Sequence, residues 1–170
     1  MLMDILNDIP FRVLLWLVPV FFMFHNIEEA PSMESWSKQL PLKIHPTVST
    51  HQFVVAVTLL TLAGFLLTYI SLAWLPILTG YLIILGMQAV MLVNAFVPHL
   101  MTTIRFRLYS PGVVTAMLIT LPFSIYLFQR AFAERVLTWG QFGILLGIAP
   151  FAMVLMADLS LQIGKVLTKP

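Results

Sequence analysis

The chain has 170 residues, of which 60% are hydrophobic and only 9% are charged, and its mean hydropathy is +0.97. This composition excludes a water-soluble globular domain, because too few polar side chains are present to cover the surface of one. No cysteine is present, which excludes disulfides, thiolate metal ligands and cysteine nucleophiles.

Five apolar stretches are long enough to cross a membrane as helices, which takes about 18 residues or more for roughly 30 Å of hydrocarbon. We expect spans at about 9–29, 52–74, 77–101, 111–128 and 139–163. Little of the chain is left over. The sequence therefore predicts an all-α polytopic membrane protein, with residues 1–170 forming a single transmembrane domain that is a bundle of about five helices. Prolines at positions 19, 98, 122 and 150 predict kinks inside the spans.

The first span ends in His25-Asn26-Ile27-Glu28-Glu29, which directly follows an apolar run. Ionisable residues within a membrane segment are costly, and by default they mark a functional site. The i, i+3, i+4 spacing places His25, Glu28 and Glu29 on one helix face. Neighbouring carboxylates in a poorly solvated place repel each other unless a cation or a shared proton intervenes. The spacing therefore favours a divalent metal site.

Other unusual polar residues follow at the ends of the later spans. They are Asn94 and His99 at the end of the third span, Arg105, Arg107 and Tyr109 in the loop after it, and Asp158 near the end of the fifth. Because consecutive spans cross in alternate directions, these residues and all four histidines fall at the same end of the bundle. The uneven distribution predicts one polar pocket, built from the first and third spans with the fifth span nearby.

The orientation follows from lysine and arginine, which are in excess on the cytoplasmic side of a membrane. The side of the N-terminus has Arg12, Arg130 and Arg135. The opposite side has Lys38, Lys43, Arg105, Arg107, Lys165 and Lys169. We therefore predict an inner-membrane protein with its N-terminus outside, its C-terminus in the cytoplasm and its polar pocket facing the cytoplasm. The pI near 9.2 mostly reflects this bias, and we expect no nucleic-acid partner.

Three sequence blocks together resemble the HXXEE family of small multi-pass bacterial membrane proteins. The blocks are the pentad at 25–29, Asn94-Ala95-Phe96-Val97-Pro98-His99, and Tyr109-Ser110-Pro111-Gly112-Val113-Val114-Thr115-Ala116. The resemblance extends from the first span through the fourth. It implies a multi-pass membrane protein without an established biochemical role, so the chemistry has to be argued from the residues themselves.

Histidine and glutamate are suitable ligands for zinc, iron or manganese. The pentad parallels the H-x-x-E-H motif of inverted zinc proteases in its spacing. On this hypothesis His25, Glu29 and His99 are metal ligands and Glu28 is the general base. Candidates for supporting or substrate-binding positions are Asn94, Arg105, Arg107, Tyr109 and Asp158. A pair of irons is an alternative, because carboxylates and histidines on facing helices also bind two metals.

The leading hypothesis is a metal-dependent membrane enzyme, of hydrolase or oxidase type, acting on a lipid or another apolar small molecule. A transporter or proton-coupled channel, in which the same histidines and glutamates relay protons, is the first alternative. A non-catalytic assembly subunit is the second. A further alternative is that the pentad is a solvated helix end paired with Lys38, Arg105 or Arg107, in which case it has none of these roles. Either arginine would bind anionic headgroups as an anchor or grip the phosphate or carboxylate of an amphiphilic substrate.

Overall fold

The computed structural model describes residues 8–40 and 46–168, and every regular element in these ranges is helical. Five helices in the described ranges are long and apolar enough to cross a membrane, which confirms an all-α multi-pass membrane protein. They cover Phe11–Glu29, Thr50–Ala73, Ile77–Phe106, Val113–Ala133 and Trp139–Leu167. The predicted spans agree to within a few residues. The third and fourth helices extend furthest beyond prediction, to Phe106 and Ala133.

Three of the spanning helices consist of shorter segments. The first comprises α2 (Phe11–Leu14) and α3 (Leu17–Glu29). The third comprises α6 (Ile77–Asn94), a π-helical segment (Ala95–Leu100) and α7 (Met101–Phe106). The fourth comprises α8 (Val113–Thr115), a π-helical segment (Ala116–Thr120) and α9 (Leu121–Ala133). The second and fifth are single helices, α5 (Thr50–Ala73) and α10 (Trp139–Leu167), and a short helix α4 (Met33–Ser37) follows α3.

Two of the predicted proline kinks coincide with the π-helical segments. Proline has no N–H to donate, and its ring clashes with the carbonyl four residues earlier in an α-helix. Pro98 lies inside the first π-helical segment, and Pro122 follows the second by two residues. Wider turns at these places accommodate the proline rings without ending the spans. At Pro150 no such segment forms, and α10 is helical throughout.

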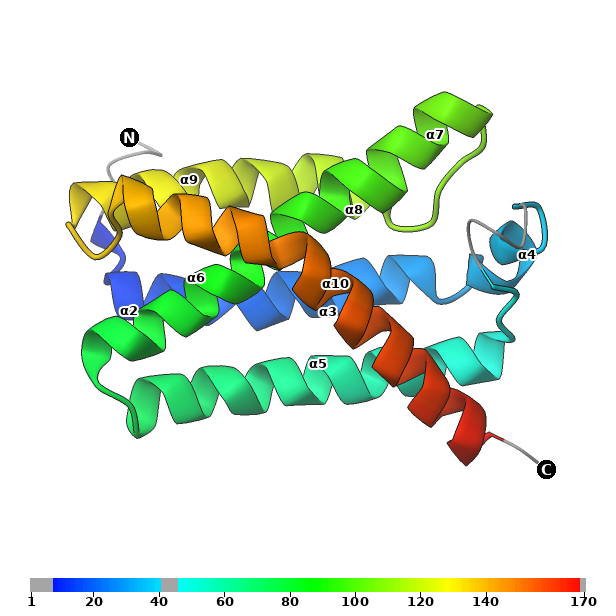
Figure 1. The fold of residues 1–170 in the computed structure, drawn as a ribbon, viewed down its shortest axis with the longest axis horizontal. Helices are drawn as coiled ribbons and strands as arrows, with labels where there is room; N and C mark the ends of the chain where they lie inside the picture. Colours follow the sequence, from blue (N-terminus) through cyan, green and yellow to red (C-terminus); the bar gives the residue numbers. More distant parts are fainter. Residues whose placement is uncertain (1–7, 41–45, 169–170) are drawn as a thin grey trace.

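The bundle has two distinct ends (Figure 1). At one end lie α2, the connection from α5 to α6 and the connection from α9 to α10. At the other end lie α4, α7 and the C-terminal end of α10. Helix α10 packs across α5 and α6. At Gly164 it approaches α5 closely, since a Cβ atom there would lie 2.5 Å from the carbonyl oxygen of Gln52.

Large aliphatic side chains fill the first of these ends, which we call the apolar end. Leu14, Leu15, Ile84, Leu85 and Leu127 are all buried there. A second apolar cluster packs α4 and the segment after it onto α5, and it comprises Met33, Trp36, Leu40, Val48, Phe53 and Val57. Helix α4 therefore covers the opposite end of the bundle, which we call the polar end.

The sidedness of the protein stays a prediction, because none of the described contacts distinguishes the two faces of a membrane. Three residues that entered the sequence argument, Lys43, His45 and Lys169, lie outside the described residues. Another of the four histidines, His51, is exposed at the start of α5, one residue after Thr50 opens the helix.

Candidate metal centre

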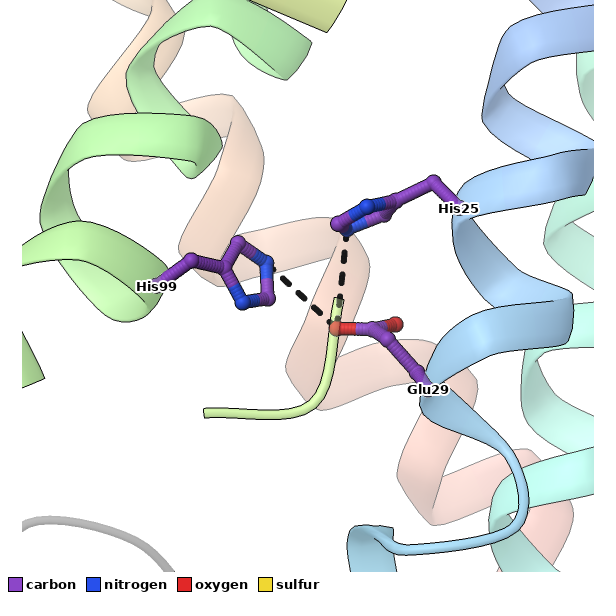
Figure 2. Close-up of side chains that lie close together, drawn as sticks. All are labelled: His25, Glu29 and His99. Carbon is purple, nitrogen blue, oxygen red and sulfur yellow. Dashed lines mark ion pairs between the residues drawn. The ribbon is translucent and has the colours of Figure 1, made fainter. Parts of the chain in front are cut away.

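Three side chains with metal-ligating atoms converge at the polar end (Figure 2). His25 and Glu29 lie one turn apart at the end of α3, and His99 comes from the π-helical segment of the third span. The Nε2 atoms of His25 and His99 lie 3.6 Å and 3.4 Å from the same carboxylate oxygen, Glu29 Oε1. One potential ligand atom from each residue lies within 4.8 Å of the others. We call these three residues the ligand cluster.

The ligand cluster is buried, with exposed fractions of 3% for His25, 8% for Glu29 and 3% for His99. The two imidazole rings meet edge to face, with their centroids 4.7 Å apart. Lys38, one of the cations considered as a partner for a solvated pentad, bonds to Glu34 at 2.6 Å instead. These three residues therefore do not form a solvated helix end.

The π-helical segment explains how Asn94 and His99 reach one place. In an α-helix, at 3.6 residues per turn, positions five apart point about 140° away from each other. A π-helix bonds residue i to i+5 and brings such positions onto one face. Asn94 Nδ2 consequently lies 2.9 Å from His99 Nε2 and also 3.1 Å from His25 Nε2. The amide of Asn94 thus joins the two histidines from the third span.

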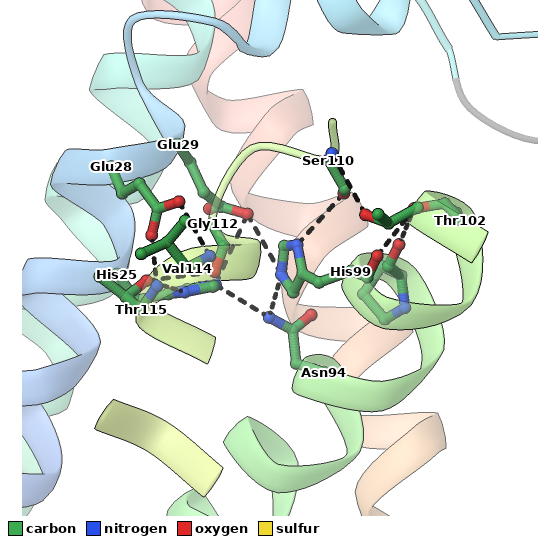
Figure 3. Close-up of polar contacts among 12 residues, drawn as sticks. His25, Glu28, Glu29, Asn94, His99, Thr102, Ser110, Gly112, Val114 and Thr115 are labelled. Carbon is green, nitrogen blue, oxygen red and sulfur yellow. Dashed lines mark hydrogen bonds and ion pairs between the residues drawn. The ribbon is translucent and has the colours of Figure 1, made fainter. Parts of the chain in front are cut away.

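Thr115, from the start of the fourth span, fixes the tautomer of His25 (Figure 3). Its hydroxyl lies 2.9 Å from His25 Nδ1 and donates to the carbonyl of Gly112 at 3.1 Å. Because the hydroxyl hydrogen is used in that bond, the oxygen accepts from His25 Nδ1–H. The lone pair of His25 is then on Nε2, which faces Glu29. Asn94 donates to the same Nε2 atom, which supports the same assignment.

His99 has the corresponding arrangement. Its Nδ1 atom lies 3.4 Å from the hydroxyl of Ser110, and its Nε2 atom accepts from the amide of Asn94. Two imidazole lone pairs and a carboxylate oxygen therefore point toward one another in a buried place. Outer partners that hold the far nitrogen of each ring are typical of histidines that bind metals through the near one. A cation bound by these three acceptor atoms would take the place of the Asn94 amide hydrogens at the two Nε2 atoms.

Gly112 allows the loop before the fourth span to close over the ligand cluster. Its φ angle is +85°, in the left-handed region that favours glycine. A Cβ atom at this position would lie 2.6 Å from Cε1 of His25, 2.9 Å from Cγ of Glu29 and 3.0 Å from Cε1 of His99. Glycine is therefore required here both for the backbone conformation and for the space above all three side chains.

Glu28 points away from the ligand cluster, toward the first turn of the fourth span. Its carboxylate accepts hydrogen bonds from the backbone N–H groups of Val114, at 3.1 Å, and Thr115, at 2.7 Å. It also accepts one from the hydroxyl of Tyr109, at 2.5 Å. Partial burial and the bond to Glu28 raise the pKa of Tyr109 to about 12, so the hydroxyl keeps its proton. Glu28 thus satisfies otherwise unpaired N–H groups of a helix start, as an N-cap does.

A pocket of about 340 Å³ adjoins the ligand cluster, between α3, α5, α6 and α10. Most of its wall is hydrocarbon, including Phe22, Phe53, Val57, Met91, Met153 and Leu161. His25, Glu29, His99 and Asn94 form a polar part of the wall. A mostly apolar pocket of this size with a few polar groups has the usual composition of a small-molecule site.

The other predicted residues lie around this centre rather than in it. Asp158 lines the pocket, but it is exposed and accepts a hydrogen bond from Gln162 at 2.7 Å. Arg105 and Arg107 are exposed beyond His99, and Arg107 has a φ angle of +53°. Tyr109 reaches the centre only through Glu28.

The sequence analysis assigned no role to Ser110, Gly112 or Thr115, although each contacts the centre. All three belong to the Tyr109–Ala116 block that the sequence singled out. Their shared block was a signal that they belong to the site, while their contacts depend on how the fourth span packs. Asn26, also unassigned, is buried and donates to Thr61 on α5 at 2.8 Å.

Comparison with known proteins places this site in a family. The family model described as "Protein of unknown function with HXXEE motif" matches residues 16–127, a range that includes the pentad and the whole centre described above. The chain belongs to the HXXEE family. It is also similar to the uncharacterized protein YrkK of Bacillus subtilis (strain 168), with 27% identity over 148 residues, covering 85% of this chain and 93% of the relative. No solved structure matches the chain.

Proposed function

We propose that this HXXEE protein binds one divalent cation through His25, Glu29 and His99 and acts as a metal-dependent enzyme on a lipid or another apolar small molecule. The observation that carries the proposal is the convergence of three buried acceptor atoms on the wall of a largely apolar pocket. Two histidines and one carboxylate with open positions is a ligand set of catalytic zinc and of non-haem iron. A bound ion would supply Lewis acidity for hydrolysis or a redox centre for oxidation.

The contacts of the remaining carboxylates support one ion rather than two. Glu28 is engaged with the backbone of Val114 and Thr115, and Asp158 is engaged with Gln162. Among the residues that the structure describes, the group suited to a metal contains one carboxylate, that of Glu29. The two-iron alternative requires at least one further carboxylate to turn inward.

The role of Glu28 as general base stays a prediction. Its three hydrogen bonds support a positioning role instead, because they hold the backbone of Thr115, whose hydroxyl in turn holds the ring of His25. A base must also be within reach of the proton it removes, and Glu28 points away from the ligand cluster.

The buried polar residues favour an enzyme over a transporter. Beyond the centre lies a separate buried pair, in which the amide of Gln88 donates to the hydroxyl of Ser124 at 2.6 Å. Past this pair lies the apolar end, where Leu14, Leu85 and Leu127 are almost completely buried. A transporter needs access from both faces of the membrane. The packing supports a pocket that opens at the polar end.

Metal analysis tests the proposal. The protein is purified in mild detergent without chelator, and its zinc, iron and manganese are measured by mass spectrometry before and after titration with each ion. We expect about one ion per chain in the wild type, and loss of the ion in His25→Ala, Glu29→Gln and His99→Ala. The matched control is His51→Ala, because His51 is exposed and outside the ligand cluster. A wild type that takes up no stoichiometric ion refutes the metal centre.

Catalysis is tested separately on the metal-loaded protein in vesicles of defined phospholipids. The lipids are followed by mass spectrometry, with Glu29→Gln as the inactive control. Addition of water across a cleaved bond indicates hydrolysis. In parallel samples that contain dioxygen and a two-electron reductant, a gain of one oxygen, with the second oxygen atom released as water, indicates oxidation. If the metal binds but the lipids are unchanged, either the enzyme acts on another class of substrate or the metal has a structural role.

A further inference from the structure

A second pocket lies beside the first at the polar end. It has a volume of about 310 Å³, and Met101, Arg105 and Phe106 of α7 form part of its wall. Trp36 of α4 and Pro98 of the π-helical segment line both pockets, so the two adjoin each other at these side chains. Pro98 precedes His99, which places the boundary between the pockets next to the ligand cluster.

Arg105 gives the second pocket a positive charge at a largely apolar wall. The other polar side chain there, Thr102, is already used, because its hydroxyl bonds to the carbonyl of Pro98. Arg105 is exposed, and none of the carboxylates in the described ranges forms an ion pair with it. A guanidinium group is well suited to carboxylates and phosphates, which it binds through two parallel hydrogen bonds.

Arg107 provides a contrast within the same loop. It is exposed like Arg105, and none of the described carboxylates pairs with it, but it lines neither pocket. If the basic residues of this loop only attracted anionic lipid surfaces, the two arginines would be equivalent. Of these two arginines, Arg105 alone combines an anion-binding group with an adjoining hydrocarbon wall.

From these contacts we infer that the pockets bind an amphiphile with an anionic carboxylate or phosphate headgroup. The hydrocarbon chain occupies the pocket of Phe22, Phe53 and Leu161, and the headgroup binds Arg105. The junction between them passes Pro98 and therefore lies beside His99. The inference rests on the proposed function for what happens at that junction, and it names the class of substrate.

Trp36 supplies the reporter for a binding experiment, because it lines both pockets and is 7% exposed. Trp16, Trp74 and Trp139 are exposed and are replaced by phenylalanine, which leaves one tryptophan. The probes are ω-bromododecanoic acid and ω-bromododecanol, whose bromine quenches nearby tryptophan fluorescence. The two probes have the same chain and differ only in the charge of the headgroup at alkaline pH.

We expect saturable quenching of Trp36 by both probes, with tighter binding of the acid. Arg105→Gln should weaken binding of the acid about tenfold or more, as expected for loss of hydrogen bonds to a charged group, and leave the alcohol unchanged. Unchanged binding of the alcohol also shows that the variant is folded. Arg107→Gln is the matched control and should leave both affinities unchanged.

Three results would overturn the inference. Equal weakening by Arg105→Gln and Arg107→Gln would mean general attraction to a basic surface. Equal affinity for acid and alcohol would mean that the headgroup is not recognised. Absence of quenching would mean that the chain does not enter the pocket. Competition by dodecyl phosphate supports an amphiphile, whereas equally strong competition by inorganic phosphate would overturn it in favour of a free anion.

Titrations in the presence and absence of chelator keep this inference separate from the metal centre. Binding of the acid that persists without metal, in a protein that takes up no ion, would refute the proposed function and retain the amphiphile site. Stoichiometric metal binding, combined with no effect of Arg105→Gln on binding of the acid, would refute the amphiphile site and retain the metal centre.

Discussion

The apolar and polar ends of the bundle are buried to a similar extent, yet different interactions hold them together. Leu14 and Leu85 are 1% and 0% exposed, and His25 and His99 are 3% exposed. At the apolar end the side chains need only fill volume, so many combinations of aliphatic residues would serve. At the polar end each buried nitrogen and oxygen needs a partner in a particular direction. Burial alone therefore does not identify the site, but the network of partners does.

A cavity at the apolar end should give the largest effect on stability and none on the site. Leu85→Ala removes a side chain that is 0% exposed, and such changes cost about 2–5 kcal/mol in soluble cores. We expect a value near 2 kcal/mol, since lipid also solvates separated helices. The free energy of unfolding in mixed micelles measures this effect, with Leu62→Ala as the control because Leu62 is 59% exposed. Loss of metal binding in Leu85→Ala would show that the two ends are coupled.

Removing one outer hydrogen bond at the polar end should have the opposite result, with a large effect on metal binding and little effect on stability. Thr115→Val deletes the hydroxyl that holds Nδ1 of His25 while preserving the shape of the side chain. We expect metal affinity to fall by about 10–100-fold, as for other partners of metal-binding histidines. Thr68→Val is the matched control, because the buried hydroxyl of Thr68 bonds only within α5, to Gly64. Equal affinities for both variants would contradict the assigned tautomer.

The same comparison explains how much the sequence could predict. Hydropathy alone gives the five spans, because each must cross the same thickness of hydrocarbon. Helical spacing brings His25 and Glu29 together, and the shared end of the bundle brings His99 near. Helical spacing places Glu28 on the same face as well, but it cannot show that the fourth span begins beside Glu28 and draws the carboxylate away. Contacts between residues about 90 positions apart depend on packing, which one sequence does not specify.

The Glu28→Gln variant distinguishes two roles of Glu28, that of a general base and that of a helix cap. The neutral amide is a poorer acceptor for the N–H groups of Val114 and Thr115, so we expect a loss of about 1 kcal/mol in unfolding free energy, as for other cap changes. Metal affinity should fall modestly, through Thr115. Tyr109→Phe removes one of the three bonds to Glu28 and should have a smaller effect. Full stability and full metal affinity combined with lost turnover would restore Glu28 as the base.

The smallest expected effect lies outside the spans, where α4 covers the polar end. Bonds from Lys38 and from the N–H and hydroxyl of Thr50 lower the pKa of Glu34 from 4.5 to about 2. A carboxylate with a lowered pKa stabilises the fold above pH 4.5, and this contribution is lost as the pH falls toward about 2. The contribution is small because the pair is solvent-exposed.

Thermal unfolding of wild type and Glu34→Gln as a function of pH measures this contribution. The difference in melting temperature should be constant above pH 4.5 and shrink below it. A difference that does not change with pH would assign the role of Glu34 to packing. Metal affinity should be the same in both proteins, since α4 contributes no ligand to the centre.

The π-helical segment at Ala95–Leu100 makes the winding of the third span part of the chemistry. If the same residues wound as an ordinary α-helix instead, everything that follows would be rotated by about 100° relative to α6. His99 would leave Asn94 and Glu29, and Arg105, six residues further along, would turn through the same angle. The wide turn therefore sets the direction of both the metal ligand and the headgroup-binding arginine relative to α6, so neither group can change its direction without the other.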